Sequence, residues 1–271
     1  MSSVIVVGLS GPSSSGKTTI ALNLIKLFPH AVVIHQDDFY KSDSQVSTNA
    51  DTGFQDWDCP LAFDMDKLVQ TIQSTRKQLE DLPECGKAVE AHSSFASQWA
   101  NPQKDVNNIL PPKALDSLRD TVLHGLDLNS TEEIPFSLIL VDGILLFYDD
   151  ANNESPGAEC DTGLFIYAQY ETLKQRREAR SAYVTKDGIW EDPPGYFDSV
   201  VWPNFVKYHS NLIAAHPEVT DKAASVGGQK SAHAVNVAVC SSDMPFKDTL
   251  DVCVESILGE WNRRQQIQAQ R

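Results

Sequence analysis

Five short runs of apolar residues, separated by polar segments, set the pattern of this chain. Each run is continuous rather than alternating, which is typical of strands buried on both faces of a parallel sheet. The pattern therefore predicts five buried strands. The runs are SVIVVGL at 3–9, AVVIH at 31–35, FSLILVDG at 136–143, GLFIYA at 163–168 and AVNVAV at 234–239.

Segments with helical spacing of apolar residues lie between these runs. They predict helices over Lys17 to Phe28, over 64–81, from about Tyr170, over 195–215, and from Phe246 to Arg263. The polar tail after Arg263 is expected to fray in solvent. Strands that alternate with helices indicate parallel βαβ units, so we expect an α/β fold with a doubly wound sheet.

One region departs from this alternation. The periodic pattern weakens over residues 85–130, and Pro111–Pro112 interrupts it. We expect an insertion there that is partly helical or mobile. The length of 271 residues suits one α/β domain carrying such an insertion, or at most two small domains.

Composition excludes several classes of protein. The formal net charge is −15, so the chain is a poor candidate for binding nucleic acid or an anionic membrane, whose phosphates would repel it. The five cysteines are odd in number, widely spread and form no CxxC pair, which argues against a zinc site or a secreted disulfide framework. No apolar stretch is long enough to span a membrane, and the start of the chain reads as a strand rather than a signal peptide. A cytoplasmic or nuclear location is the expectation.

The stretch GLSGPSSSGKTT, directly after the first predicted strand, has the spacing of a phosphate-binding loop. Gly11, Gly16, Lys17 and Thr18 fit G-x-x-x-x-G-K-[ST], with a helix predicted to follow. Glycines let the backbone N–H groups turn inward, and the helix amino end adds positive partial charge. The predicted ATP-phosphate ligands are Gly11, Pro12, Ser13, Ser14, Ser15, Gly16, Lys17, Thr18 and Thr19.

A partner for this loop stands at the end of the third predicted strand, where LILVDG ends in Asp142 and Gly143. In phosphate-loop proteins an acid here helps to hold Mg²⁺ or its water ligands. We therefore predict a Mg²⁺ site made by the Thr18 hydroxyl and Asp142. The alternative is a simple Asp-Gly turn at a strand end.

Two classes of protein use such a loop, nucleotide-dependent switches and phosphotransferases. The chain has no N-K-x-D run, which a guanine-reading switch would normally carry. It does have HQDDFYK at 35–41, which puts Asp37 and Asp38 just after the second strand, on the same crevice. A carboxylate there is suited to orient an acceptor hydroxyl and take its proton. This favours a phosphotransferase, with a helix cap or solvated turn as the alternative.

Several motifs together resemble the nicotinamide riboside kinases, within the uridine kinase-like group of phosphate-loop kinases. These motifs are GPSSSGKTT, HQDDFYK, QDWDCPLAFD, LVDGILLF, YETLKQRREAR and DPPGYFDSVVWP. The resemblance runs from residue 4 to about 210, skipping 85–130. It implies a single P-loop kinase domain over 1–271, of three-layer α/β/α architecture with five parallel strands and a small lid at about 170–195. It also implies ATP- and Mg²⁺-dependent phosphorylation of the 5′-hydroxyl of nicotinamide riboside.

The resemblance also implies roles for single residues. Asp37 would act on the 5′-hydroxyl, Trp57 would cover the nucleoside ring, and Asp58 would bind the ribose hydroxyls. Arg177 would share the ribose contact, and Asp192 would lie near the carboxamide. Phe39 joins the substrate side through the HQDDFYK motif, and Tyr183 is a second candidate ring, although an insertion changes the spacing around it. A pyridinium ring carries positive charge, which an indole face and nearby carboxylates attract. The alternatives for Trp57 and Asp58 are a loop aromatic that covers the core and a turn residue before Cys59–Pro60.

The segment KQRREAR gathers basic side chains on the helix after the fourth strand. Arg176 and Arg180 are i, i+4 neighbours and are predicted to bind ATP phosphates when the lid closes. The spacing does not say which arginine binds phosphate and which binds ribose. The alternative is a solvated helix face with local acidic partners.

Other readings remain open from the sequence. A kinase for uridine or cytidine, or a nucleotide-binding regulatory module without turnover, would carry the same phosphate loop. The histidines show no metal-ligand spacing, and His35 is assigned a structural role. The expected partners are nicotinamide riboside and ATP, for a protein that is a monomer or a weak dimer.

Overall fold

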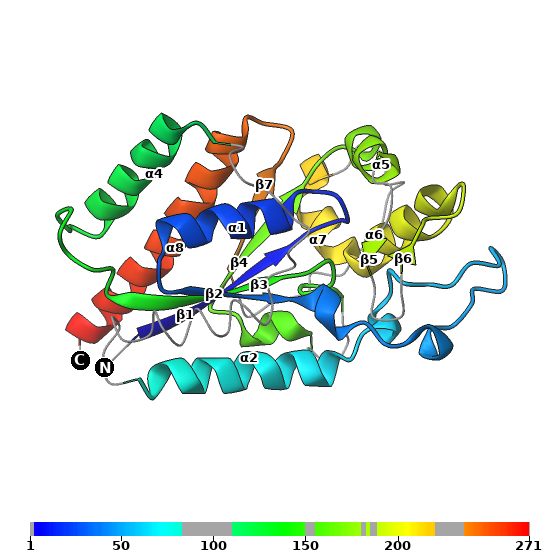
Figure 1. Ribbon diagram of the computed structural model, residues 1–271, viewed down its shortest axis with the longest axis horizontal. Coiled ribbons are helices and arrows are strands. Elements are labelled where there is room, and N and C mark those ends of the chain that lie inside the picture. The colour runs from blue at the N-terminus through cyan, green and yellow to red at the C-terminus, as the bar shows by residue number, and fades with distance from the viewer. Residues whose placement is uncertain are drawn as a thin grey trace.

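Five parallel strands form the central sheet in the order β2-β3-β1-β4-β7 (Figure 1). Their register brings the ends of three strands level, because His35 and Leu9 both lie opposite Asp142. Side chains that follow these strands therefore meet at one edge of the sheet. The strands are β1 (Ser3–Ser10), β2 (Ala31–His35), β3 (Phe136–Asp142), β4 (Thr162–Tyr167) and β7 (Val237–Ser241).

The computed structural model describes residues 3–82, 110–149, 155–179, 183–184, 189–219 and 236–270. Within these ranges, two strands outside the main sheet form an antiparallel pair, β5 (Tyr183–Val184) and β6 (Ile189–Trp190). Of the region expected to be an insertion, residues 85–109 lie outside the described ranges.

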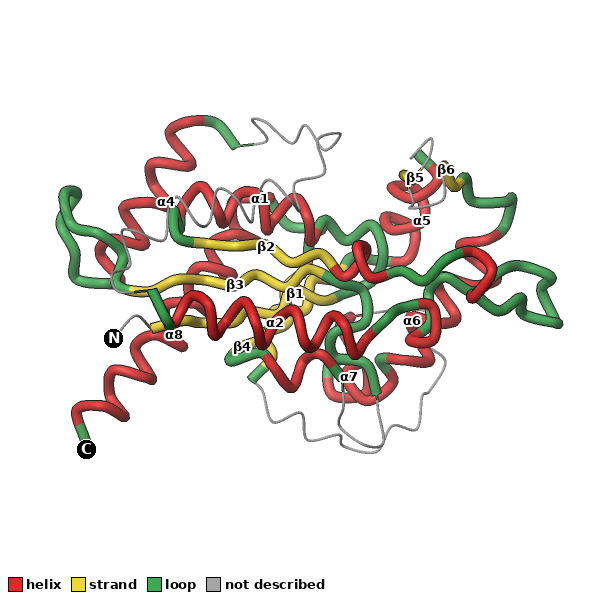
Figure 2. The backbone as a smooth tube through the Cα atoms, turned by 60° about the horizontal axis from the view of Figure 1, so that its bottom comes forward, coloured by secondary structure: helices red, strands yellow, loops and turns green. Residues whose placement is uncertain are grey.

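Helices cover both faces of the sheet, giving three layers (Figures 1 and 2). One face packs against α1 (Lys17–Leu27), α4 (Pro112–Gly125) and α8 (Phe246–Ala269). The other packs against α2 (Met65–Glu80), α5 (Tyr170–Glu178), α6 (Trp202–Tyr208) and α7 (Ser210–Ala215). Strand β1 shows why, since Ile5 and Val7 join the first core and Val4 and Val6 the second. The predicted α/β fold with a five-stranded parallel sheet is confirmed.

Some predicted elements have different limits. The single helix expected over 195–215 is divided into η6 (Phe197–Val201), α6 and α7. Strand β7 begins at Val237, three residues later than expected; residues 234 and 235 lie outside the described ranges. Pro112 occupies the first turn of α4 instead of interrupting a pattern, because a residue in that position needs no N–H partner. Leu118 and Val122 of α4 are buried in the core shared with α1 and α8.

The expectation that the tail frays after Arg263 is wrong. Helix α8 continues to Ala269, through Arg, Gln and Ala residues that favour helix. Arg264 accounts for part of this extension, since its guanidinium lies 2.6 Å from Asp161 and 2.8 Å from Glu260. It also donates to the carbonyl of Val4 at 2.8 Å. Ion pairs of this kind leave no trace in a hydrophobic pattern.

A buried phenylalanine fixes the chain that follows β3. The Phe147 ring lies so close to Gly8 and Gly163 that a Cβ atom on either would come within 2.6 Å of it. Phe147 is fully buried. This packing holds residues 143–147 against the end of the sheet, where the candidate site lies.

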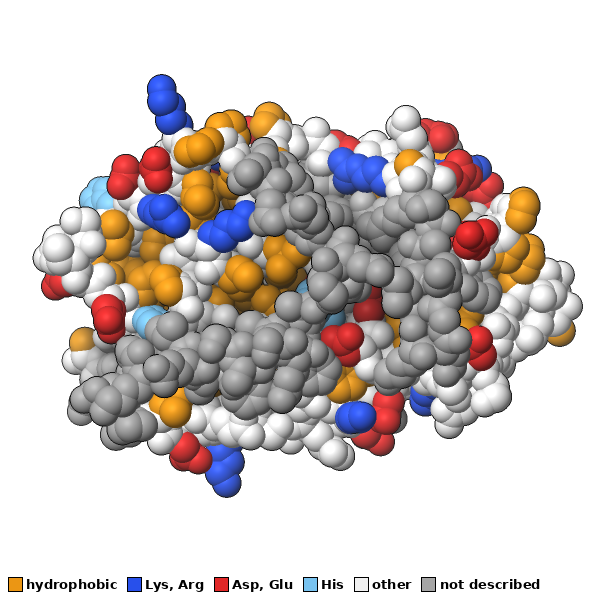
Figure 3. Space-filling view, in the orientation of Figure 1, with side chains coloured by type: hydrophobic (Ala, Val, Ile, Leu, Met, Phe, Trp, Pro, Cys, Tyr) orange, Lys and Arg blue, Asp and Glu red, His pale blue; other side chains and the backbone are white. Residues whose placement is uncertain are grey.

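The surface carries charges of both signs. Acidic and basic side chains are interspersed on the face drawn in Figure 3, so the surplus of negative charge is not gathered there. None of the helices in the described ranges combines the length and apolar character that crossing a membrane requires.

Candidate active site

The loop between β1 and α1 has the geometry of an anion cradle. Gly11 has φ +142°, and a Cβ atom there would lie 2.0 Å from the carbonyl oxygen of Ile166 in β4. Gly16, at the amino end of α1, has φ +93°. Only glycine adopts such angles readily and allows so close an approach. The loop is therefore pressed against β4, with the helix amino end behind it.

Lys17 begins α1 and turns back toward the loop. Its Nζ donates a hydrogen bond to the carbonyl of Pro12 at 2.9 Å, and the residue is only 6% exposed. The ammonium group thus lies within the curve of the loop. Together with the helix dipole it makes this the most favourable place on β1–α1 for a phosphate group.

Thr18 and Asp142, which the sequence paired as metal ligands, lie in contact. The Thr18 hydroxyl donates to Asp142 Oδ2 at 2.6 Å, and His35 Nδ1 lies 3.1 Å from the same oxygen. Burial raises the pKa of Asp142, but the hydrogen bond and charge of His35, then Lys17 and Thr18, hold it below its usual value. Asp142 is therefore ionised at neutral pH. His35, assigned only a structural role from the sequence, belongs to this group.

A side-chain amide joins the ends of β2 and β3. Gln36 Oε1 accepts from the backbone N–H of Leu145 at 3.0 Å, and its Nε2 donates to the Leu145 carbonyl at 3.3 Å. Gln36 fits only because Gly143 has no side chain, since a Cβ atom there would lie 2.6 Å from Gln36 Oε1. The amide fixes the 143–147 segment beside the short helix η1 (Gln36–Phe39) that carries Asp37.

Asp37 and Phe39, the two candidate site residues on η1, lie in different environments. Asp37 is exposed, and its charge contributes to the raised pKa of both Tyr40 and Asp58, after the larger effect of burial. The Asp37 carboxylate therefore lies near both groups. Phe39 is 2% exposed and packs in the core shared with α2, so the structure does not bring it together with the other candidates.

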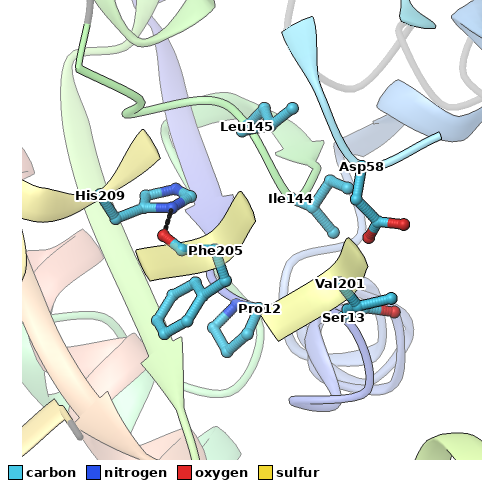
Figure 4. A pocket seen from close by; sticks show the side chains of 8 residues that line it. All are labelled: Pro12, Ser13, Asp58, Ile144, Leu145, Val201, Phe205 and His209. Atoms are coloured by element: carbon cyan, nitrogen blue, oxygen red, sulfur yellow. Dashed lines mark hydrogen bonds between the residues drawn. The ribbon is translucent and has the colours of Figure 1, made fainter. Parts of the chain in front are cut away.

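A small, partly open hollow of about 10 Å³ lies between the phosphate loop and Asp58 (Figure 4). It has room for about one water molecule. Pro12 and Ser13 form one side of it, and Asp58 reaches it from the segment before α2. The remaining wall comes from the chain after β3 and from the helices beyond the β5–β6 pair. Its residues are Ile144, Leu145, Val201, Phe205 and His209. Residues far apart in the sequence thus surround one cavity.

Arg177 of α5 lies between two carboxylates. Its Nε is 2.6 Å from Asp192 Oδ2 and its second nitrogen is 3.1 Å from Asp192 Oδ1, a two-pronged contact. Its third nitrogen lies 3.5 Å from Asp58 Oδ1. Burial raises the pKa of Asp58 to about 6, because Arg177 offsets the burial only partly and Asp192, Asp56 and Asp37 add like charge. Asp192 was expected near a carboxamide, and here it engages Arg177.

Trp57 lies among aromatic side chains at the edge of this cluster. It is 9% exposed, and its ring meets Tyr40 edge-on with centroids 5.7 Å apart. Tyr196 accepts a hydrogen bond from the Trp57 backbone. Sequence reasoning missed Tyr40 and Tyr196, although both stand inside motifs that it singled out, HQDDFYK and DPPGYFD.

The basic helix divides its arginines between two places. Arg177 is buried in the cluster, while Arg176 donates to the Ser242 hydroxyl at 2.9 Å and to the Ser242 carbonyl at 3.0 Å, beyond β7. The contact of Arg176 with phosphate stays a prediction. Arg180 lies outside the described residues, and of Tyr183 only the backbone, in β5, is described.

Comparison with known proteins identifies relatives by sequence. No model of a protein family matches the chain. The nicotinamide riboside kinase of Schizosaccharomyces pombe is 30% identical over 255 residues, covering 94% of this chain and 96% of that protein. That of Saccharomyces cerevisiae is 36% identical and covers 78% and 79%. Nicotinamide riboside kinase 1 of Homo sapiens is 30% identical and covers 83% and 85%.

Among solved structures, a sugar kinase from Janibacter aligns over 94% of both chains at 13% identity, with a TM-score of 0.33. A likeness that low adds nothing to the assignment. The sequence relatives suffice, because they match at 30% identity or more over most of both chains. The chain belongs to the nicotinamide riboside kinase family.

Proposed function

We propose that the protein transfers the terminal phosphoryl group of ATP to the 5′-hydroxyl of nicotinamide riboside, giving nicotinamide mononucleotide. Family membership supports the activity. The observation that carries it is that the phosphate loop, at Pro12 and Ser13, and Asp58 border the same small hollow. A donor phosphate and a sugar therefore have adjoining places.

The phosphate side rests on the cradle around Lys17. Its ammonium and the amino end of α1 bind the outer phosphates and offset charge that spreads over the transferring group. We assign Mg²⁺ to Thr18 and Asp142, whose hydroxyl and carboxylate are the oxygen donors that this ion prefers. Among the described residues no group of three or more His, Cys, Asp or Glu could hold a metal, which suits an ion bound largely through phosphates and water. When bound, the ion neutralises phosphate charge.

The acceptor side rests on Asp37, Asp58 and Arg177. Asp37 is exposed beside the cluster and accepts the proton of the 5′-hydroxyl as that oxygen attacks phosphorus. Asp58 and Arg177 bind the two ribose hydroxyls: the Asp58 carboxylate accepts hydrogen bonds from them, and the Arg177 guanidinium donates to them. Trp57 and Tyr40 offer aromatic cover to the pyridinium ring, and the surrounding carboxylates favour its positive charge.

The proposal extends to the domain as a whole and to its lid. Residues 1–271 act as one catalytic domain, in which the segment at about 170–195 serves as the lid. Closure of such a lid excludes water and limits the loss of ATP to hydrolysis.

The test is ADP release by the purified protein with a panel of acceptors, namely nicotinamide riboside, its acid analogue, uridine, cytidine and none. We expect release that depends on the riboside. Asp37→Ala should abolish transfer while ATP still binds, and Asp51→Ala, an exposed carboxylate in the neighbouring loop, is the matched control. Turnover with a pyrimidine nucleoside alone would reject the substrate. ATP binding without any acceptor-dependent release would reject the activity.

A further inference from the structure

The loop that carries Trp57 and Asp58 is held by residues from the far side of the lid region. The Tyr196 hydroxyl donates to the carbonyl of Gln55 at 2.9 Å and accepts from the backbone N–H of Trp57 at 3.2 Å. Eight residues further on, Asn204 Nδ2 donates to Asp56 Oδ1 at 2.6 Å. Residues 55–57 are thus bound by the chain that follows β6.

The same tyrosine also supports the opposite side of the cluster. The Arg177 guanidinium carbon lies 5.6 Å from the centroid of the Tyr196 ring, within the range of a cation–π contact. Phe54 meets that ring edge-on at 5.8 Å, and Tyr196 itself is 1% exposed. One buried side chain therefore contacts Arg177 with its face and the Asp58 loop with its hydroxyl.

We propose that Tyr196, assisted by Asn204, is a positioning residue that sets the spacing of a ribose clamp made by Asp58 and Arg177. This inference rests on the proposed function. Asp58 and Arg177 are already 3.5 Å apart in the folded chain, and a ribose diol must fit against both. A clamp with a fixed spacing discriminates between sugars, because a sugar lacking one hydroxyl leaves a buried polar group without its partner.

The test replaces the hydroxyl and keeps the ring. Tyr196→Phe removes both hydrogen bonds to the loop and retains the surface beneath Arg177. Asn204→Ala removes the second attachment. Tyr208→Phe is the matched control, because that hydroxyl accepts only an exposed contact from Lys207 at 3.3 Å among the hydrogen bonds seen here. Each variant is assayed with nicotinamide riboside and its 2′-deoxy analogue, at saturating and at varied ATP.

We expect Tyr196→Phe to raise the KM for the riboside by about tenfold, the size expected for two lost hydrogen bonds. The KM for ATP should stay within about twofold of the wild type, since both hydrogen bonds of the Tyr196 hydroxyl go to the loop that carries Asp58, on the acceptor side. The preference for the riboside over its 2′-deoxy analogue should fall by a similar factor. Asn204→Ala should shift both quantities by about threefold, and Tyr208→Phe should shift neither.

A purely structural role for Tyr196 would lower the Tm and leave the preference unchanged. A folded Tyr196→Phe with the wild-type preference would overturn the inference. If that variant does not fold, the preference of Asn204→Ala decides in the same way. A wild type that fails to phosphorylate the riboside would instead remove the proposed function, and this inference with it.

Discussion

The buried Asp58 carboxylate lowers the stability of the folded chain, so replacing it with a neutral residue should raise the free energy of unfolding. It is 6% exposed, and its pKa is raised from the ordinary value of 3.8 to about 6, mainly by burial. The folded chain therefore binds the proton more tightly than the unfolded chain does. Between pH 4 and pH 6 the folded state holds more protons, so stability falls as pH rises through this window. By pH 7 the ionised carboxylate costs about 3 kcal/mol.

Asp58→Asn should recover much of that cost. The amide has nearly the same shape and no charge, and Arg177 keeps its two-pronged contact with Asp192 at 2.6 and 3.1 Å. The substitution therefore does not leave a buried guanidinium unpaired, which is the usual penalty for breaking such a pair. We expect the free energy of unfolding at pH 7 to rise by up to about 3 kcal/mol, and the Tm by about 5–10 °C. Riboside kcat/KM should fall sharply.

The assay is urea denaturation of wild type and Asp58→Asn at pH 7 and at pH 5. At pH 5 the wild-type carboxyl is mostly protonated in the folded state, so the gain should shrink to about half. Asp51→Asn, which removes an exposed carboxylate, is the control and should change little at either pH. A variant that is no more stable than the wild type at pH 7, or whose gain is the same at both values, would refute the reasoning.

Three further predictions concern the same site, and a fourth concerns helix α8. Riboside kcat/KM should fall as the pH drops below about 6, because protonated Asp58 no longer accepts from both ribose hydroxyls. The KM for ATP should not change in the same way, and pH profiles of both constants test this. Asp142→Asn should raise the Mg²⁺ concentration needed for half-maximal rate by at least about tenfold, measured by titration at fixed ATP, and an unchanged requirement would remove Asp142 from the metal site. Gly11→Ala should abolish ATP binding, measured by calorimetry, because its Cβ would lie 2.0 Å from the Ile166 carbonyl oxygen. Gly259→Ala, with open space around its Cβ in helix α8, should instead raise the free energy of unfolding by about 0.5–1 kcal/mol, measured by urea denaturation.

The sequence predicted those parts of the site that follow from strand ends. A continuous apolar run must be a buried strand, and parallel strands deliver the residues after them to one edge. Lys17, Thr18 and Asp142 could therefore be brought together without coordinates. In the structure Thr18 donates to Asp142, and the charge of Lys17 lowers the pKa of Asp142. Asp58 and Arg177 came only through resemblance to a family, because no local rule places the segment before α2 against α5.

Contacts between non-consecutive loops could not be predicted. Arg176 and Arg177 are equivalent by spacing, but consecutive helical residues point about 100° apart. One is buried against Asp58 and the other reaches Ser242. The role of Tyr196 depends on tertiary contacts, since its partners Gln55 and Trp57 are about 140 residues away in the sequence. The extension of α8 depends in part on Arg264, whose partners lie in β1, in the loop before β4 and in α8 itself.

The charge balance of the cluster connects its fold to its chemistry. Arg177 is the cation that offsets Asp58, while Asp192, Asp56 and Asp37 all add negative charge to the same place. Folding alone gains nothing from this surplus, because each carboxylate raises the cost of ionising the others. A pyridinium ring adds the positive charge that the cluster lacks, so binding of the proposed substrate relieves a repulsion that the free protein carries. The destabilised state of Asp58 is then a source of affinity for a cationic nucleoside, which a neutral nucleoside such as uridine does not gain.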